Sequence, residues 1–580
     1  MLKSLGTLWP YLVKYRRGLA LGIGALLMKD VLAVCLPLVI KYGVDSLTRG
    51  FQVRTLLNFA GLLVAVSLIK GVFQYWMRVI IIGISRDIEY DLRNDLFSHL
   101  VVLSQNFYSR YRTGDIMARS TNDLNAVRMM LGPGIMYWSE TSVMLVLAVA
   151  VMARVDLRLT LIALIPAPLV SVAVIFFGRR IHARFEHIQR MFSDISSRVQ
   201  ENLAGVRVVR AYAQERAQVE QFETLNRDYI RENIGLARIQ GMFMPLLQAL
   251  IGLTFLLVMW IGGQQLMQKR ITLGEFVMFN TYMGMLIWPM IAFGWVVNLM
   301  QRGTASLNRI NEMLHEQPAI AAPSGEPADP ESRSAAITFR DVSVKFGDRP
   351  ALSRINLTIG AGETVAIVGH TGSGKTTLVN LIGRLIDPTE GTVSFGGTDL
   401  RQFDPQQLRR QIGFVPQETF LFSATLAENI AWGVESATRE EIEKAAQVAG
   451  LASDIAAFPD GLDTVVGERG LTLSGGQKQR TAIARAILRN PRILVLDDAL
   501  SSVDTVTEDR ILRGLAGIMQ DRTTILISHR VSTVQNAHRI VVLSHGAIME
   551  IGTHSELQAR GGYYAELYEK QLLEEELEAI

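Results

Sequence analysis

Cysteine is almost absent from this chain of 580 residues, in which Cys35 is the only one. A single cysteine excludes a disulfide scaffold and any zinc or iron–sulfur site that needs several thiolates. An excess of charge is also lacking, because 58 basic residues are balanced by 55 acidic ones. That balance, together with 49% hydrophobic residues, excludes a disordered chain or a basic tail, and we expect no nucleic acid among the partners.

Long hydrophobic runs fill the first half of the chain and are missing from the second half. Six runs reach the roughly 20 mostly apolar residues that a helix needs to cross a bilayer. They cover approximately residues 19–42, 56–84, 129–153, 159–178, 239–268 and 276–300. The last three contain no aspartate, glutamate, lysine or arginine. We therefore predict a multi-pass membrane protein with the lipid bilayer as its surroundings.

The basic residues indicate which loops lie in the cytoplasm. Lys3, Lys14, Arg16 and Arg17 precede the first run, which is too long for a cleavable signal and has no cleavage site after it. Basic residues are also frequent in two long loops, 86–128 and 179–238, and scarcer in the loops of the opposite side. Because basic loops stay inside, the N-terminus, both long loops and the C-terminal half are predicted to be cytoplasmic.

The two long loops are polar and free of proline, and the first has apolar residues at heptad-like spacing. Such spacing favours helices that continue out of the membrane. We expect each loop to form two helical arms joined by a bend, near 113–115 in the first and near 203–205 in the second. Residues 5–15 are aromatic and basic, which favours a short interfacial helix over a disordered leader.

A change of composition near residue 317 marks a domain boundary. Segment 317–336 is rich in proline, alanine, glycine and serine, as linkers are. After it, β-branched runs at 364–368, 413–415, 493–497, 524–527 and 540–543 alternate with helical stretches, which predicts a parallel α/β domain. We expect a multidomain membrane protein, with an all-α domain of six spans and long cytoplasmic helical extensions over 1–316, a linker over 317–336, an α/β domain over 337–570 and an acidic tail over 571–580.

One glycine-rich segment matches the phosphate-loop pattern G-x-x-x-x-G-K-[ST] between an apolar strand and a helix. Its residues are Gly369, His370, Thr371, Gly372, Ser373, Gly374, Lys375 and Thr376, followed by Thr377 in the helix. The glycines allow backbone N–H groups to surround phosphate oxygens, and the helix N-terminus adds positive potential. Lys375 would neutralise β- and γ-phosphates, and Thr376 would ligate Mg²⁺.

A second signal is the buried strand 493–497, which ends in the carboxylate of Asp497. The tip of such a strand is where a phosphate-bound metal lies in an open α/β sheet. Together with the phosphate loop, this strand predicts a nucleotide site with Mg²⁺.

A further anion-binding surface is predicted at Ser474, Gly475, Gly476 and Gln477, ahead of a helix over 478–488. One nucleotide does not need two such surfaces from one chain. We therefore expect this one to serve a nucleotide held by another subunit, the alternative being a flexible turn.

The phosphate loop, Gln417, the Leu-Ser-Gly-Gly-Gln segment, the aspartate strand, Asp504 and His529 occur in this order. This order resembles the nucleotide-binding domain of ABC transporters. Preceded by six spans, the whole chain resembles a half-transporter of the ABC exporter type. The resemblance implies ATP and Mg²⁺ as cofactors, a second half-transporter as partner, and alternating access as the mechanism.

The same resemblance implies a role for each matching residue. Phe346 would stack on adenine, although tyrosine is more usual there, and Gln417 would sense Mg²⁺ as a metal ligand and contact the membrane domain. Residues 466–470 would meet the loops of the membrane domain. Asp504 would cross the dimer interface. His529 would act as the switch histidine at the γ-phosphate.

The residue after the strand aspartate departs from the family pattern, because Asp498 stands where glutamate is usual. Aspartate is one methylene shorter, which withdraws its carboxylate by ~1 Å and can cost ~100-fold in rate. Such a replacement resembles the degenerate subunit of heterodimeric bacterial multidrug exporters. We expect this chain to hydrolyse ATP slowly at its own site and to complete a competent site on a different subunit. A homodimer that tolerates aspartate is the alternative.

Charged residues inside the spans are Lys29, Asp30, Lys70, Arg78 and Glu140. Such charges are costly in a membrane and face a cavity or a partner. Glu140, near the middle of the third span, is the candidate for a group that faces substrate, and the alternative is a structural ion pair with a basic span residue.

The predicted function is ATP-driven export of small amphipathic molecules, drug-like or lipid-like, across the bacterial cytoplasmic membrane by half of a heterodimer. The alternatives are a homodimeric lipid or peptide exporter and an ATP-gated channel or regulatory subunit.

Overall fold

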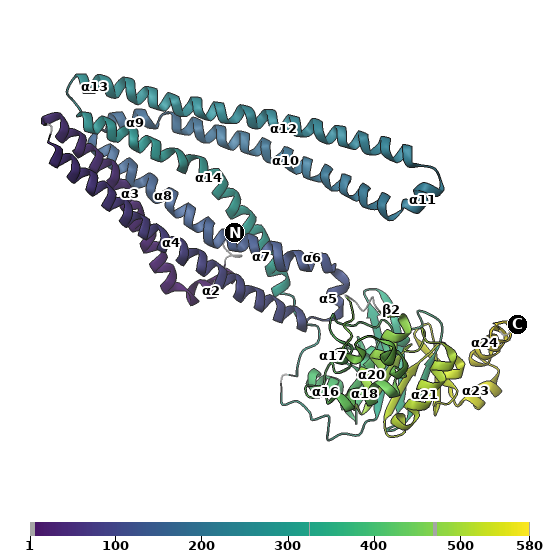
Figure 1. The fold of residues 1–580 in the computed structure, drawn as a ribbon. Helices are drawn as coiled ribbons and strands as arrows, with labels where there is room; N and C mark the ends of the chain where they lie inside the picture. The colour runs from purple at the N-terminus through teal and green to yellow at the C-terminus, as the bar shows by residue number, and fades with distance from the viewer. Residues whose placement is uncertain (1–5, 51, 324, 468–472, 579–580) are drawn as a thin grey trace. The chain divides into compact units, whose positions relative to one another are not determined.

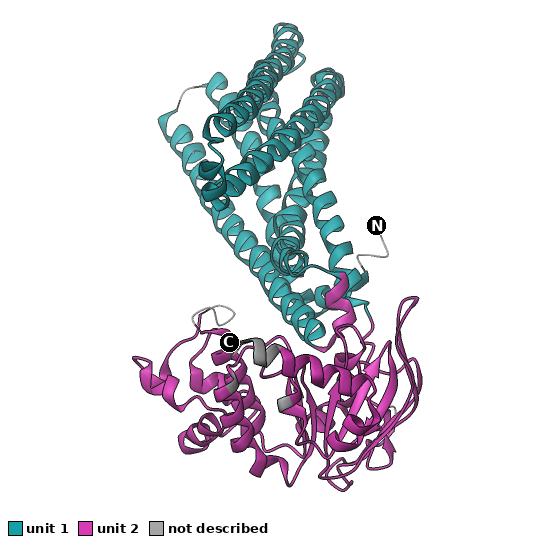
Figure 2. Cartoon of the chain, turned by 90° about the vertical axis from the view of Figure 1, so that its right-hand side faces the viewer, with its two compact units in different colours: residues 1–101, 111–316 teal, residues 102–110, 317–580 magenta. Residues whose placement is uncertain are grey.

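The computed structural model describes residues 6–50, 52–323, 325–467 and 473–578. The chain divides into two compact units, which Figure 2 colours separately. The first comprises residues 1–101 and 111–316, and the second comprises residues 102–110 and 317–580.

The first unit is helical throughout its described residues (Figure 1). Its shorter helices are η1 (Gly6–Leu8), α2 (Trp9–Lys14), α6 (Thr113–Ala118), α7 (Leu124–Met129), α9 (Leu157–Leu164), α11 (Val206–Ala211) and α13 (Gly263–Met267). Its long helices are α3 (Arg16–Arg49), α4 (Val53–Val102), α8 (Ile135–Val155), α10 (Pro166–Ala204), α12 (Glu215–Leu257) and α14 (Leu273–Leu314). Single π turns at η2 (Arg119–Asp123), η3 (Met130–Gly134) and η4 (Val258–Gly262) join neighbouring helices.

The six predicted spans are confirmed. Within the described residues, six helical stretches are long and apolar enough to cross a membrane. They are Arg16–Arg49, Val53–Val102, Thr113–Val155, Leu157–Ala204, Glu215–Met267 and Leu273–Leu314. Several of them continue well past their apolar runs, as predicted for helical arms in the two long loops.

The second helical arm pair is formed by α10 and α12, which run side by side and are joined by α11 (Figure 1). Arg184 Nη1 lies 3.2 Å from Glu232 Oε2 across the pair, and the rings of Phe177 and Phe243 are 5.4 Å apart. The bend follows Ala204, where it is predicted. The bend of the first loop lies earlier than predicted, because Thr113 already opens α6 and the chain turns around α5 (Gln105–Arg110).

The second unit contains two sheets, one of which the sequence reading missed. The missed sheet is antiparallel, in the order β2-β1-β4-β5, with β1 (Ile337–Phe346), β2 (Arg349–Ile359), β4 (Glu390–Phe395) and β5 (Thr398–Asp399). A register shift between Phe339 and Val342 moves the buried side chains of β1 from odd to even positions. That bulge hides the alternation by which a half-buried strand is recognised.

The other sheet has the order β10-β9-β3-β8-β7-β6 and is parallel from β6 to β9. Its strands are β3 (Thr364–Val368), β6 (Ile412–Val415), β7 (Ile493–Asp497), β8 (Thr523–Ile527), β9 (Arg539–Ser544) and the antiparallel β10 (Ala547–Gly552). All five predicted strands are therefore confirmed. The predicted parallel α/β domain is confirmed by the pairing of β6 to β9, whereas the antiparallel strand β10 and the antiparallel sheet were not predicted.

Hydrophobic cores lie on both faces of the parallel sheet. Ala366 and Val368 of β3 belong to a core shared with α18 (Arg439–Val448), α20 (Gly475–Leu488) and α21 (Thr505–Met519). Val365 and Ile367 point to the opposite core, shared with the antiparallel sheet and α15 (Lys375–Ile382). The remaining helices are α16 (Pro405–Arg410), α17 (Leu426–Ile430), α19 (Ala452–Ala457), α22 (Val531–Val534), α23 (His554–Arg560) and α24 (Tyr563–Glu578), with 3₁₀ turns at Leu400–Gln402 and Gly461–Asp463. This two-sided burial explains the continuous apolar runs of the central strands.

Segment 317–336, which has the composition of a linker, belongs to the second unit, and two of its residues are bound by arginines from the rest of that unit. Arg492 Nη1 donates to the Pro330 carbonyl oxygen at 2.9 Å, and Arg384 Nη2 donates to the Ala321 carbonyl oxygen at 3.0 Å. At the other end of the unit, the predicted acidic tail continues as helix α24 as far as Glu578.

Candidate functional site

The phosphate loop connects the fully buried strand β3 to helix α15. A Cβ added to Gly369 would meet the Leu543 carbonyl oxygen at 2.1 Å, and one added to Gly374 would meet the Ala351 carbonyl oxygen at 2.7 Å. Gly374 also has φ +101°, in the left-handed region. Glycine is therefore required at both positions, because the loop passes close to neighbouring backbone.

Lys375, the first residue of α15, is buried within this loop. Its Nζ donates to the carbonyl oxygens of Gly369 at 2.8 Å and His370 at 2.9 Å. Burial lowers the pKa of Lys375, and the negative charges of Asp497 and Asp498 oppose that shift. A bound phosphate would add negative charge beside the ammonium group and further favour its charged form.

Asp497 and Thr376 are the oxygen donors that fit a divalent cation. Asp497 ends the buried strand β7, hydrogen-bonds the Thr376 side chain, and has a buried Oδ2 atom without a hydrogen-bond partner. Burial raises the pKa of Asp497, and the neighbouring charge of Asp498 raises it further. A cation bound at this carboxylate would relieve both penalties, so the two residues fit Mg²⁺. Among the described residues, no group of three or more His, Cys, Asp or Glu side chains could hold a metal.

Most of the predicted site residues line one cavity of about 300 Å³. It is lined by Phe346, Ala351, Thr371, Gly372, Gly374, Lys375, Thr376, Thr377, Gln417, Asp497, Asp498, Ile527 and His529. These residues come from the ends of parallel strands and from the antiparallel sheet, as expected for a site at the carboxyl edge of an α/β sheet. Ala351 and Ile527 were missed by the sequence reading because neither has a polar group that would single it out.

Three predicted loop residues lie outside the cavity lining. The Gly369 carbonyl oxygen binds Lys375 instead. The His370 ring packs edge-on against Tyr563, with 4.9 Å between ring centroids. Ser373 Oγ is buried and has no hydrogen-bond partner.

Asp498 is held in a left-handed conformation, with φ +51°. Its N–H donates to the Ile527 carbonyl oxygen at 3.0 Å, and its own carbonyl oxygen accepts from Ser501 Oγ at 3.0 Å. The buried side chain of Gln479 supports this turn, because its Nε2 donates to Ser501 Oγ and its Oε1 accepts from the Ser502 N–H, each at 2.9 Å. Gln479 was also missed, since it lies just beyond the recognised motif.

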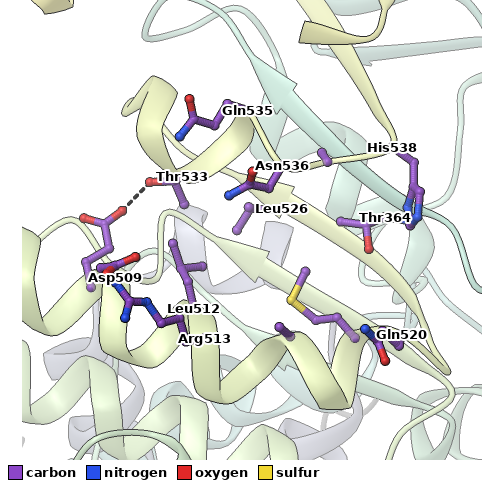
Figure 3. Close-up of a pocket in the computed structure, with 14 residues that line it drawn as sticks. Thr364, Asp509, Leu512, Arg513, Gln520, Leu526, Thr533, Gln535, Asn536 and His538 are labelled. Atoms are coloured by element: carbon purple, nitrogen blue, oxygen red, sulfur yellow. Dashed lines mark hydrogen bonds and ion pairs between the residues drawn. The ribbon is translucent and has the colours of Figure 1, made fainter.

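A larger cavity of about 550 Å³ lies elsewhere in the second unit and shares no lining residue with the first. Figure 3 shows Asp509, Arg513 and His538 among the side chains around it. The described residues that line it include no glycine-rich loop and no lysine, so it lacks a cradle for phosphates.

Ser474 to Gln477 form the N-terminus of helix α20. Ser474 Oγ accepts from the Gln477 N–H at 3.3 Å, and Gln477 Oε1 accepts from the Ser474 N–H at 2.9 Å. A Cβ on Gly476 would meet the Ser502 carbonyl oxygen at 3.0 Å, so glycine lets this turn approach the loop after Asp498. Of the described residues that line the phosphate cavity, none belongs to this turn. The two predicted anion-binding surfaces are thus separate within one chain.

Two further predicted positions lie near these loops. Asp504 caps α21 by accepting from the Thr507 N–H at 2.8 Å, and this hydrogen bond lowers the pKa of Asp504. Asp504 does not line the phosphate cavity. In the predicted contact segment 466–470, residues 468–470 lie outside the described part of the chain.

Comparison with known proteins matches both halves of the chain. The family described as ABC transporter transmembrane region matches residues 19–290, and the family described as ABC transporter matches residues 352–501.

Relatives match almost the entire length. The probable multidrug resistance ABC transporter ATP-binding/permease protein YheI of Bacillus subtilis is 38% identical over 99% of this chain and 98% of its own length. The multidrug resistance-like ATP-binding protein MdlA of Escherichia coli is 37% identical over 98% of this chain and 97% of its own length. The ATP-dependent lipid A-core flippase of Syntrophus aciditrophicus is 35% identical over 96% and 93%.

Among solved structures, a bacterial Atm1-family ABC exporter with ATP bound matches with a TM-score of 0.79 and 29% identity, covering 96% of this chain and 98% of that one. Six spans, a phosphate-loop ATPase unit and matches over nearly all residues together show that the chain belongs to the ABC transporter family, as an ATPase-coupled membrane transporter of the exporter type.

Proposed function

We propose that this chain exports small amphipathic molecules across the bacterial cytoplasmic membrane as one half of a dimer, and that its partner is a different half-transporter. The observation that carries the proposal is the separation of the phosphate cavity from the Ser474–Gln477 turn. The N-terminus of a helix binds anions through its backbone N–H groups, and this one has no phosphate from its own chain's cavity to bind. The phosphate that this turn binds is therefore held by a second subunit.

The main predicted site residues have distinct roles in this proposal. Lys375 neutralises the β- and γ-phosphates, and Phe346, half-exposed at the end of β1, stacks on adenine. Thr376, Asp497 and Gln417 would hold Mg²⁺, which would supply positive charge to the phosphate oxygens. Asp498 orients the attacking water, His529 contacts the γ-phosphate, and Asp504 reaches across the dimer interface.

The heterodimer is proposed because Asp498 replaces the usual glutamate while the rest of the cavity is complete. A carboxylate withdrawn by ~1 Å polarises water poorly. A partner with glutamate at this position would receive the Ser474–Gln477 turn and hydrolyse ATP at the ordinary rate. We assign residues 1–316 to transport, 337–570 to ATP binding, 317–336 to their connection and 571–580 to an acidic tail.

The substrate class follows from the chemistry that the relatives share. Their names refer to multidrug resistance and to a lipid A-core flippase. Both kinds of cargo combine an apolar body with a polar group. Inverted membrane vesicles that contain the chain and its partner should accumulate an amphipathic fluorescent dye or lipid against its gradient when ATP is added. Equilibration without accumulation would instead show an ATP-gated channel.

Glu140 has the ion-pair surroundings of a structural residue. Lys29 Nζ lies 2.6 Å from Glu140 Oε1 and 2.9 Å from Asp30 Oδ1, and both Lys29 and Asp30 are buried. One ammonium group thus bridges two carboxylates from α3 and α8. We therefore favour the structural role over direct substrate contact.

Replacing Lys29 with methionine should destabilise the first unit by ~3–5 kcal/mol, because two carboxylates lose their shared partner inside a span. Glu140→Gln should cost only ~1–2 kcal/mol, since Lys29 keeps Asp30 and the amide oxygen still accepts a hydrogen bond. Thermal unfolding of the purified chain in detergent measures both effects. A Glu140→Gln chain that folds normally yet no longer transports cationic amphiphiles would assign Glu140 to the substrate instead.

A further inference from the structure

The segment that follows β8 and carries His529 is fixed by side chains from two helices that are distant in sequence. On one side stands Glu508 of α21, whose side chain is almost fully buried. It forms an ion pair with Arg530 and accepts a hydrogen bond from Thr533, the contact drawn as a dashed line at Thr533 in Figure 3. Arg530 Nη1 also donates to the Val503 carbonyl oxygen at 3.1 Å.

On the other side stands Gln571, near the middle of the C-terminal helix α24. Its Oε1 accepts from the Val531 N–H at 2.7 Å, and its Nε2 donates to the His529 carbonyl oxygen. The Val531 N–H opens the short helix α22, where no intrahelical acceptor exists. The amide of Gln571 therefore forms one hydrogen bond to the backbone of the residue before Arg530 and one to the backbone of the residue after it. A side chain that can only donate or only accept would lose one of these two bonds.

Helix α24 is itself anchored close to the phosphate loop. Tyr564 is fully buried, and its hydroxyl lies 2.7 Å from His554 Nδ1. The Tyr563 N–H donates to Glu550 Oε1 at 2.8 Å, and the Tyr563 ring packs against the His370 ring of the phosphate loop. The same helix thus contacts the phosphate loop at its start and the His529 segment two turns later.

We propose that Gln571 is a positioning residue for ATP hydrolysis, through which the C-terminal helix holds His529 at the γ-phosphate. This inference rests on the proposed function, which gives His529 that role. His529 itself belongs to the phosphate cavity, and its backbone is clamped by Gln571. A helix that also contacts the phosphate loop lets the chain couple the position of its C-terminal end to the rate of hydrolysis.

The test compares Gln571→Ala and Gln571→Glu in the full-length chain, reconstituted in lipid nanodiscs and assayed by single-turnover hydrolysis of ATP. The alanine variant loses both hydrogen bonds, and the glutamate variant keeps an acceptor for Val531 but places a carboxylate against the His529 carbonyl oxygen. We expect each to lower the hydrolysis rate about tenfold, with the KM for ATP and the unfolding temperature unchanged. Glu569→Ala, an exposed position on the same helix, is the matched control and should hydrolyse ATP as the unaltered chain does.

The double variant with His529→Ala shows whether Gln571 acts through the histidine. In that background, Gln571→Ala should have no further effect, since there is no imidazole left to position. A tenfold loss that persists without His529, or a loss accompanied by a raised KM for ATP and a lowered unfolding temperature, would overturn the inference. If Gln571→Ala matches the unaltered chain while His529→Ala is impaired, only the inference fails. If His529→Ala itself hydrolyses ATP normally, the proposed role of His529 fails and the inference with it.

Discussion

Replacing Asp497 with asparagine is expected to reduce Mg²⁺-dependent ATP hydrolysis by at least ~100-fold. The amide has the same shape and can keep the hydrogen bond with Thr376, so the fold of the second unit should be preserved. It removes the charge that would bind the cation, and with it the unpartnered Oδ2 atom that makes this carboxylate a ligand. Hydrolysis of labelled ATP over a range of Mg²⁺ concentrations measures the loss, and Asp460→Asn, at an exposed position, is the control.

Acidic pH should affect this carboxylate earlier than an ordinary one. Burial raises the pKa of Asp497 above the usual ~3.9 of an aspartate, so protons compete with Mg²⁺ at a higher pH than they otherwise would. As pH falls through that raised pKa, Mg²⁺ affinity should decline in the unaltered chain. The Asp497→Asn chain should lack this dependence. Normal hydrolysis by that variant would contradict the metal assignment.

Replacing Asp498 with glutamate is expected to raise ATP turnover of the chain by up to ~100-fold. The added methylene moves the carboxylate ~1 Å closer to the attacking water, which is the distance by which aspartate falls short. The backbone requires a residue with φ +51°, which costs glutamate somewhat more than aspartate, but Gln479 and Ser501 hold the turn regardless of the side chain. Steady-state ATPase measurements on the purified chain give the change directly.

Asp498→Asn is the matched control for this prediction, since it keeps the shape of the side chain and cannot act as a base. It should not exceed the unaltered chain. Robust turnover of the unaltered chain that falls in Asp498→Asn and does not rise in Asp498→Glu would show that aspartate suffices here. The homodimer would then replace the heterodimer as the proposed assembly.

The central elements of the ATPase unit could be predicted because local and tertiary signals agree. The strand at Thr364–Val368 is buried on both faces, so its sequence is a continuous apolar run bounded by glycine. Ile493–Asp497 is also fully buried, and its terminal carboxylate marks the edge where the site lies. Spans are recognised for a similar reason, since lipid requires a long apolar stretch whatever the packing.

Contacts that join distant residues left no comparable signal. The bulge in β1 interrupts the two-residue alternation of buried side chains, and the sequence of that strand does not indicate which strands pair with it. Gln479 and Gln571 are ordinary helix residues until the fold places them beside Ser501 and His529. The ion pair of Lys29 with Glu140 joins two spans, so the sequence could name Glu140 as a candidate to face substrate, with an ion pair as the alternative, but could not show the pairing itself.

The most direct test asks whether the Ser474–Gln477 turn of one chain meets the phosphate loop of another. Cys35 is the only native cysteine, so a chain with Cys35→Ser and Ser474→Cys presents a single thiol. Its partner, or a second copy of the chain, would carry one cysteine in the phosphate loop at the position of Thr371, an exposed residue beside the cavity. After ATP has been hydrolysed and the resulting ADP trapped by vanadate in place of the released phosphate, oxidation should produce a cross-linked species of two chains, and omission of ATP should prevent it. Failure to cross-link with either partner under trapping conditions would contradict the claim that two chains close on a shared nucleotide.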